Sequence, residues 1–165
     1  MSTRSRSRLF SFSVFVAAAG VWVSPAAAIV DESSRGPNAP VPPPTRAERA
    51  VKAALGTVGT PYRWGGESPT TGFDCSGLVR WAYGRVGVEL PHNSYALYGE
   101  GLRVRETRME VGDLLFFEGL GHVGLYLGSG RMVHSPQTGR NVEVVRLDVT
   151  NYGARLVGAR RVVAS

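Results

Sequence analysis

The amino-acid sequence predicts an α+β fold, with helices near the N-terminus packed on an antiparallel sheet of five to six strands. Two segments before residue 88 carry apolar residues at helical spacing. The second half instead holds short runs of β-branched, aromatic and aliphatic residues separated by glycine or proline turns. Helices first and strands afterwards are typical of α+β proteins.

Residues 1–28 have the pattern of a signal peptide. Three arginines precede an apolar stretch, residues 9–23, and an Ala-Ala-Ala run at residues 26–28 provides a small-x-small cleavage site. The alternative is an uncleaved membrane anchor, because the stretch is close to the minimum length of a span. We expect cleavage after Ala28 and a mature protein that is secreted or lies in the cell envelope, without stable membrane insertion.

Composition limits the number of domains and the kinds of partner that we expect. Removal of residues 1–28, which hold three arginines and no acid, lowers the formal net charge from +6 to +3. The other arginines are scattered and no aromatic residues interleave with them, so we expect no nucleic-acid partner. Residues 29–45 are predicted to be a flexible proline-rich linker. Residues 46–165 are long enough for one core and are predicted to be a single, monomeric domain.

The first predicted helix begins after Thr45. Thr45 and Glu48 have the spacing of a capping box, and either Gly56 or Gly59 is expected to end the helix. A glycine-rich loop over residues 59–72 follows.

The second predicted helix begins after Asp74 and ends at Gly84 or Gly87. Cys75, the only cysteine, therefore lies on its first turn. Backbone N–H groups at a helix N-terminus favour a thiolate, and one of them can also point at a developing oxyanion. The alternatives for a lone thiol are a buried apolar residue or a link between two chains.

Two histidines are placed to assist such a thiol. His122 precedes one β-type run and His134 ends the next, so a hairpin would bring both to the same end of adjacent strands. A histidine close to a thiol completes an ion pair and later protonates the leaving amine. His92 lies in a loop with no strand to hold it, and we rank it below the other two. The predicted strands are residues 113–117, 123–127, 131–134, 142–147 and 155–163.

Two other readings of these residues are rejected. Residues 119–124 match the dinucleotide pattern G-x-G-x-x-G, but no helix follows to hold a pyrophosphate. One cysteine and two histidines offer too few zinc ligands and no close ligand pair. We expect neither a metal nor a cofactor.

From about Gly59 to Leu147 the chain resembles the NlpC/P60 cell-wall peptidases of the papain-like superfamily. His134, in Met132-Val133-His134-Ser135-Pro136, follows the four stretches that carry the resemblance. These stretches are Thr60-Pro61-Tyr62-Arg63-Trp64-Gly65-Gly66, Phe73-Asp74-Cys75-Ser76-Gly77-Leu78-Val79, Val111-Gly112-Asp113-Leu114-Leu115-Phe116-Phe117 and Gly121-His122-Val123-Gly124-Leu125-Tyr126-Leu127-Gly128.

The resemblance implies a secreted hydrolase that cuts peptidoglycan stem peptides, typically between D-γ-glutamyl and a diamino acid. It assigns Cys75 as nucleophile, His122 as general base and His134 as the group that orients His122. The alternatives are an amidase or acyl-transfer enzyme of the same superfamily and a non-catalytic wall-binding module. The residues that it implies in substrate binding are Tyr62, Asp74, Ser76 and Trp64.

One stretch departs from the family. The family often carries an arginine where His92 stands, which leaves the substrate contacts on that side open. Asp74 has a second reading as a plain helix cap, and Trp64 as a pocket wall or core residue.

Overall fold

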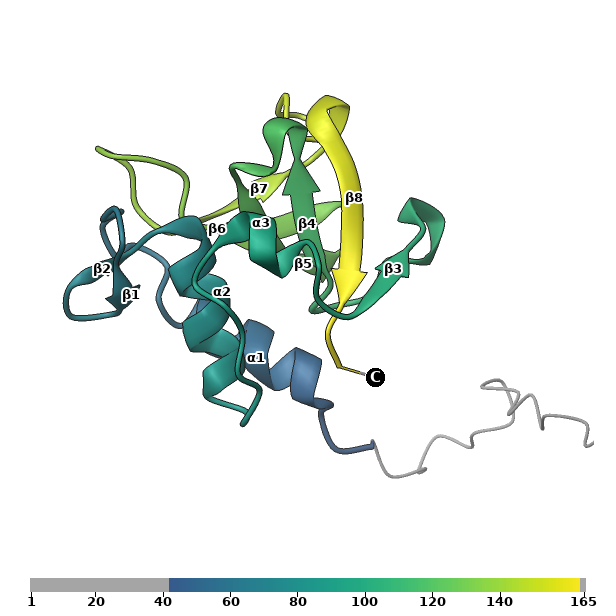
Figure 1. The fold of residues 1–165 in the computed structure, drawn as a ribbon, viewed down its shortest axis with the longest axis horizontal. Coiled ribbons are helices and arrows are strands. Elements are labelled where there is room, and N and C mark those ends of the chain that lie inside the picture. The colour runs from purple at the N-terminus through teal and green to yellow at the C-terminus, as the bar shows by residue number, and fades with distance from the viewer. Residues whose placement is uncertain (1–41, 164–165) are drawn as a thin grey trace, which may run out of the picture. The chain divides into compact units, whose positions relative to one another are not determined.

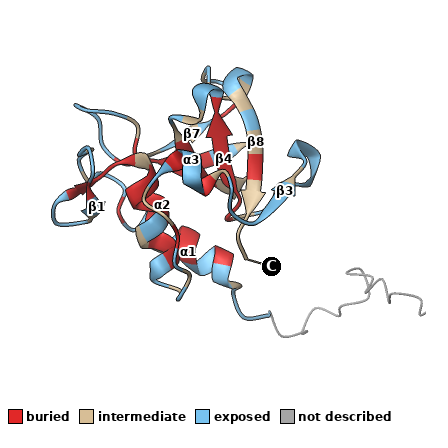
Figure 2. Cartoon of the chain, in the orientation of Figure 1, coloured by how far each residue is buried: buried red, intermediate tan, exposed pale blue. Residues whose placement is uncertain are grey.

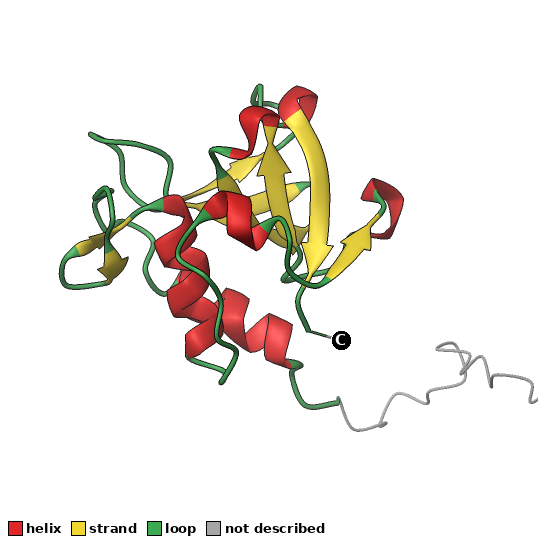
Figure 3. Ribbon diagram, in the orientation of Figure 1, coloured by secondary structure: helices red, strands yellow, loops and turns green. Residues whose placement is uncertain are grey.

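The computed structural model describes residues 42–163, and these have the α+β fold predicted from the sequence (Figures 1 and 3). The predicted signal peptide and most of the predicted linker lie outside the described residues. Residues 42–44, at the end of that linker, are exposed and have no regular secondary structure. Within the described range, every helix is too short or too polar to cross a bilayer.

The first helix, α1, spans Arg46–Leu55 and confirms the predicted capping box. The backbone N–H of Thr45 donates to Glu48 Oε2 at 2.7 Å, and the N–H of Glu48 donates to Thr45 Oγ1 at 3.1 Å. Gly56 is the C-cap, so the first of the two expected stop residues ends the helix. Helix α2 spans Cys75–Gly84, as predicted, and a short α3 follows at Ser94–Leu97.

Six antiparallel strands form the main sheet, in the spatial order β3-β8-β4-β5-β6-β7. Five of them match the predicted runs, and β3 was missed because its three residues are too few to show a period. A separate two-stranded sheet, β1 (Glu67–Ser68) with β2 (Gly72–Phe73), precedes α2. The main strands are β3 (Leu102–Val104), β4 (Leu114–Phe117), β5 (Val123–Gly128), β6 (Arg131–His134), β7 (Glu143–Arg146) and β8 (Leu156–Arg161).

Strand β4 is apolar throughout because both of its faces are buried. Leu114 and Phe116 pack into the core that α1 and α2 close, whereas Leu115 and Phe117 belong to a second cluster that includes Met132. Successive side chains of a strand point to opposite faces, so β4 is buried on both sides (Figure 2). Helix α2 packs on β5 and α1 on α2, which fixes the start of α2 next to the sheet.

Candidate active site

Asp74 sets the start of α2 and thereby the position of Cys75. Asp74 is the N-cap, and its Oδ1 accepts the backbone N–H of Gly77 at 2.7 Å, as a capping carboxylate does. The same carboxylate accepts the Ser76 hydroxyl at 3.0 Å and the Gly65 N–H at 2.9 Å. The capping role considered for Asp74 is thus confirmed. Because Asp74 and Ser76 are buried and bonded to each other, substrate contact by either remains a prediction.

The glycine-rich loop before α2 lies directly against the first turn of the helix. The N–H of Asp74 donates to the carbonyl of Gly66 at 3.0 Å. A Cβ at Gly77 would lie 2.0 Å from that carbonyl oxygen, and a Cβ at Gly66 would lie 2.4 Å from the Gly72 oxygen. Only glycine allows this approach, so the loop and the Cys75 turn are held together by backbone contact.

The thiol of Cys75 is partly exposed and lies beside the chain that carries His122. Its Sγ is 3.9 Å from the carbonyl oxygen of Gly121. Burial raises the pKa of Cys75, the charge of Asp74 adds to the rise, and the backbone N–H groups of Val123, Ser76 and Cys75 oppose it. The expected stabilisation of a thiolate is therefore present but outweighed by burial, and the resting thiol is protonated.

His122 and His134 are joined by a hydrogen bond between Nε2 and Nδ1, which lie 2.8 Å apart. His122 immediately precedes β5, His134 ends β6, and the two strands are paired antiparallel, as predicted. Burial lowers the pKa of His122 to about 3, with further lowering from His134 and Arg155. Burial, assisted by Arg140, lowers the pKa of His134 to about 4. Both imidazoles are therefore neutral at neutral pH.

Tyr152, which no sequence pattern indicated, covers this pair of histidines. Its ring stacks on His122, with 5.6 Å between centroids and 27° between planes, and meets His134 edge-on at 4.9 Å. Phe117 contacts both Tyr152 and His122. An aromatic cover of this kind keeps water from the imidazoles and contributes to their burial.

The other two predicted substrate-binding residues lie on the glycine-rich loop. Tyr62 is partly buried, and burial, followed by the charges of Cys75 and Asp74, raises the pKa of its phenol. Trp64 is 86 % exposed, which excludes the alternative that it is a core residue. An exposed indole on this loop is available for contact with a ligand.

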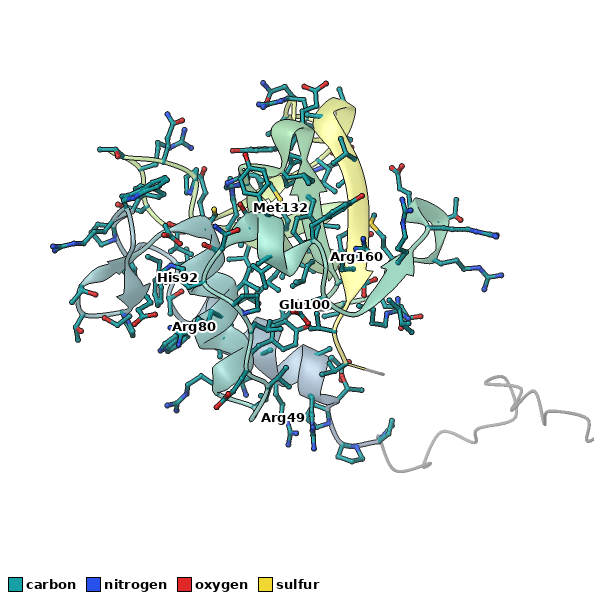
Figure 4. All side chains as sticks on the ribbon, in the orientation of Figure 1. Arg49, Arg80, His92, Glu100, Met132 and Arg160 are labelled. Carbon is teal, nitrogen blue, oxygen red and sulfur yellow. The ribbon has the colours of Figure 1, made fainter. Side chains whose placement is uncertain are left out.

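His92 lies outside any strand, as predicted, yet side chains fix its position. Its Nε2 donates to the carboxylate of Asp74, 3.0 Å from Oδ1, and its Nδ1 lies 3.4 Å from Glu67 Oε2. Glu67 also pairs with Arg80, and Figure 4 shows Arg80 and His92 on the same side of α2. His92 therefore helps to hold the capping carboxylate of Asp74 at the start of α2.

A metal is not needed to explain this constellation. Among residues 42–163, no group of three or more histidine, cysteine and acidic side chains is arranged to hold an ion. Nucleophilic thiol chemistry uses a nucleophile, a base and a third group that orients the base. The partly exposed thiol and the two hydrogen-bonded imidazoles can fill these places.

The comparisons with known proteins point in one direction. The NlpC/P60 family model matches residues 59–161. The murein DD-endopeptidase MepH of Escherichia coli is 38% identical over 130 residues, which cover 72% of this chain and 48% of that protein. The bifunctional muramidase/DL-endopeptidase CwlT of Bacillus subtilis is 43% identical over 98 residues, 56% of this chain and 30% of that protein. The chain thus matches about half or less of the length of these relatives.

Solved structures agree with the sequence relatives. An NlpC/P60 family protein from Bacillus cereus has a TM-score of 0.68 at 35% identity, over 75% of this chain and 42% of that one. The peptidoglycan hydrolase RipB from Mycobacterium tuberculosis has a TM-score of 0.65 at 34% identity, over 73% of this chain and 66% of that one. With the family model covering most of the described residues, the chain belongs to the NlpC/P60 family.

Proposed function

We propose that this protein is a cysteine peptidase that hydrolyses peptidoglycan stem peptides through Cys75, His122 and His134. The observation that carries the proposal is the 2.8 Å hydrogen bond between His122 Nε2 and His134 Nδ1, beside a thiol on the first turn of α2. A module that only bound the wall would have no need of a hydrogen-bonded histidine pair at a thiol. Relatives named as endopeptidases and peptidoglycan hydrolases support the same activity.

The reaction begins from neutral groups. Nε2 of His122 is engaged by His134, so Nδ1 is the nitrogen left to take the thiol proton as Sγ attacks the scissile carbonyl. The backbone N–H of Cys75, on the first helical turn, is suited to stabilise the oxyanion. His122 then returns the proton to the leaving amine, and water hydrolyses the thioester.

The bond we propose lies between D-γ-glutamyl and the diamino acid of the stem peptide, which makes the enzyme a D,L-endopeptidase. The Bacillus subtilis relative, named a DL-endopeptidase, supports this choice. A second candidate is the D,D cross-link, since the Escherichia coli relative is named a DD-endopeptidase. Amide or ester transfer by the same thiol is the remaining alternative within the superfamily.

The location and the organisation of the chain are part of the proposal. Residues 1–28 would direct export and be removed, residues 29–45 would link, and residues 46–165 would act as a monomeric catalytic domain in the cell envelope or outside the cell. N-terminal sequencing of protein recovered from the medium or envelope tests this. A mature N-terminus at Ile29 supports it, and full-length protein in the membrane fraction contradicts it.

Digestion of purified sacculi, followed by mass analysis of the released fragments, tests the activity. Cleavage after D-γ-glutamyl leaves dipeptides on the glycan, whereas D,D cleavage converts cross-linked dimers into monomers with intact stems. Release of sugar-free stems would indicate an amidase. If the folded protein releases no fragments from sacculi, a non-catalytic wall-binding module is the only remaining alternative.

A further inference from the structure

His134 has one ring nitrogen that lacks a hydrogen bond. Its Nδ1 is bonded to His122, but its Nε2 is buried and has no hydrogen-bond partner among the described residues. The side chain has no exposed surface. A buried polar atom without a partner costs roughly 1–3 kcal/mol, so this nitrogen calls for an explanation.

The acceptor nearest to hand is Glu143. Its Oε1 lies 3.5 Å from His134 Nε2, slightly beyond hydrogen-bonding distance. His134 and Glu143 are direct partners in the β6–β7 ladder, so the two strands hold the side chains on the same face. Glu143 keeps 27% of its side chain exposed, so a small rotation of this side chain can close the gap.

We propose that Glu143 is a positioning residue that holds the proton of His134 on Nε2 and thereby selects the reactive tautomer of His122. The effect on catalysis rests on the proposed function, whereas the effect on the histidine tautomers does not. A carboxylate accepts hydrogen bonds only, so it requires a proton on His134 Nε2. His134 Nδ1 must then accept the proton of His122 Nε2, which leaves His122 Nδ1 unprotonated and able to act as a base.

Arg140 holds the carboxylate of Glu143 next to His134. Its guanidinium donates to both carboxylate oxygens of Glu143, at 2.7 and 2.6 Å. The same positive charge opposes protonation of His134 and contributes to its lowered pKa. His134 is therefore held neutral while its tautomer is fixed.

The tautomers can be measured without any substrate. Protein labelled with ¹⁵N-histidine gives long-range ¹H–¹⁵N spectra that distinguish the protonated ring nitrogen of each histidine, with assignment by single His→Gln variants. We expect Nε2–H on both His122 and His134 at pH 7. In Glu143→Ala the acceptor is lost, and in Glu143→Gln the amide both donates and accepts, so each variant should populate Nδ1–H forms. Glu100→Gln, an exposed glutamate labelled in Figure 4, should leave the spectrum unchanged.

Activity gives a second readout. Glu143→Ala and Glu143→Gln should lower kcat by roughly tenfold or more at unchanged KM, short of the ~10⁴-fold loss when a triad histidine is held in the wrong tautomer. A wild-type His122 protonated on Nδ1, or tautomers unaltered in both folded Glu143 variants, would overturn the inference. Failure of the wild type to cut sacculi would instead reject the proposed function, and the spectra would still decide the role of Glu143.

Discussion

Nε2 of His122 and Nδ1 of His134 lie 2.8 Å apart, so one hydrogen bond ties the residue before β5 to the last residue of β6. The antiparallel pairing of these strands brings together two residues that are twelve positions apart in the sequence. Because His134 is buried and His122 is half-buried, the bond is partly shielded from water, and burial lowers the pKa of both imidazoles.

The first prediction concerns the pH dependence of catalysis. The reactive form carries the thiol proton on Cys75 and none on His122 Nδ1. Burial lowers the pKa of His122 to about 3 and raises that of Cys75, so the reactive form should persist from acid to alkaline pH. We expect the acid limb of kcat/KM on soluble muropeptides well below pH 6.5, with folding checked at each pH by circular dichroism. An acid limb at the ordinary histidine value would contradict the buried, neutral site.

Stability should also depend on pH through the two histidines. Their folded-state pKa values, about 3 and about 4, lie below the ordinary 6.5, so the unfolded chain binds more protons between these values. The contribution of these histidines to the free energy of unfolding should therefore be constant above pH 6.5 and fall as the pH drops toward 4. Urea denaturation at pH 7.5 and 4.5 measures this. A His122→Gln/His134→Gln double variant should show a smaller difference, and an equal difference would remove these histidines as the cause.

Tyr152 is expected to act by shielding. Tyr152→Ala exposes both imidazoles, so the acid limb should move up toward pH 6.5 and kcat should fall while KM changes little. Tyr152→Phe keeps the stacked ring and should keep the wild-type profile. Tyr95→Ala, at an exposed tyrosine of α3, is the control for the loss of a tyrosine. An equal loss of kcat in Tyr152→Phe and Tyr152→Ala would instead show that the hydroxyl, rather than the ring, is the important group.

Two glycines of α2 should respond in opposite directions to alanine. At Gly77 a Cβ would meet the Gly66 oxygen at 2.0 Å, so Gly77→Ala should destabilise the fold by about 1–3 kcal/mol. At Gly84 a Cβ meets nothing within 4 Å, and Gly84→Ala should be neutral or stabilising by up to ~1 kcal/mol. Urea denaturation of both variants compares them directly. A Gly77→Ala protein as stable as the wild type would mean that the loop is not held against the helix.

The sequence was sufficient where the signal is local. The capping box of Thr45 and Glu48, the helix that begins at Cys75, and the hairpin that joins His122 to His134 all depend on residues close together in the chain. Spacing therefore predicted most elements of the fold and the three residues at the centre of the candidate site.

Long-range packing explains what the sequence could not reveal. Tyr152 lies in a turn with no pattern of its own and reaches the histidines only because the chain folds back after β7. Glu143 lies opposite His134 because of a β6–β7 register that no motif specifies. The protonated thiol of Cys75 follows from burial, which is a property of the assembled site and outweighs the effect of the helix start.

The most direct test of the central claim is the release of stem-peptide fragments from purified sacculi by the wild-type protein and by Cys75→Ala, measured side by side by mass spectrometry. Cys75→Ala removes the thiol at a partly exposed position, so the variant should fold and bind sacculi as the wild type does. We expect release by the wild type and a loss of at least ~10³-fold in the variant. Equal release by the two proteins would contradict a mechanism based on Cys75.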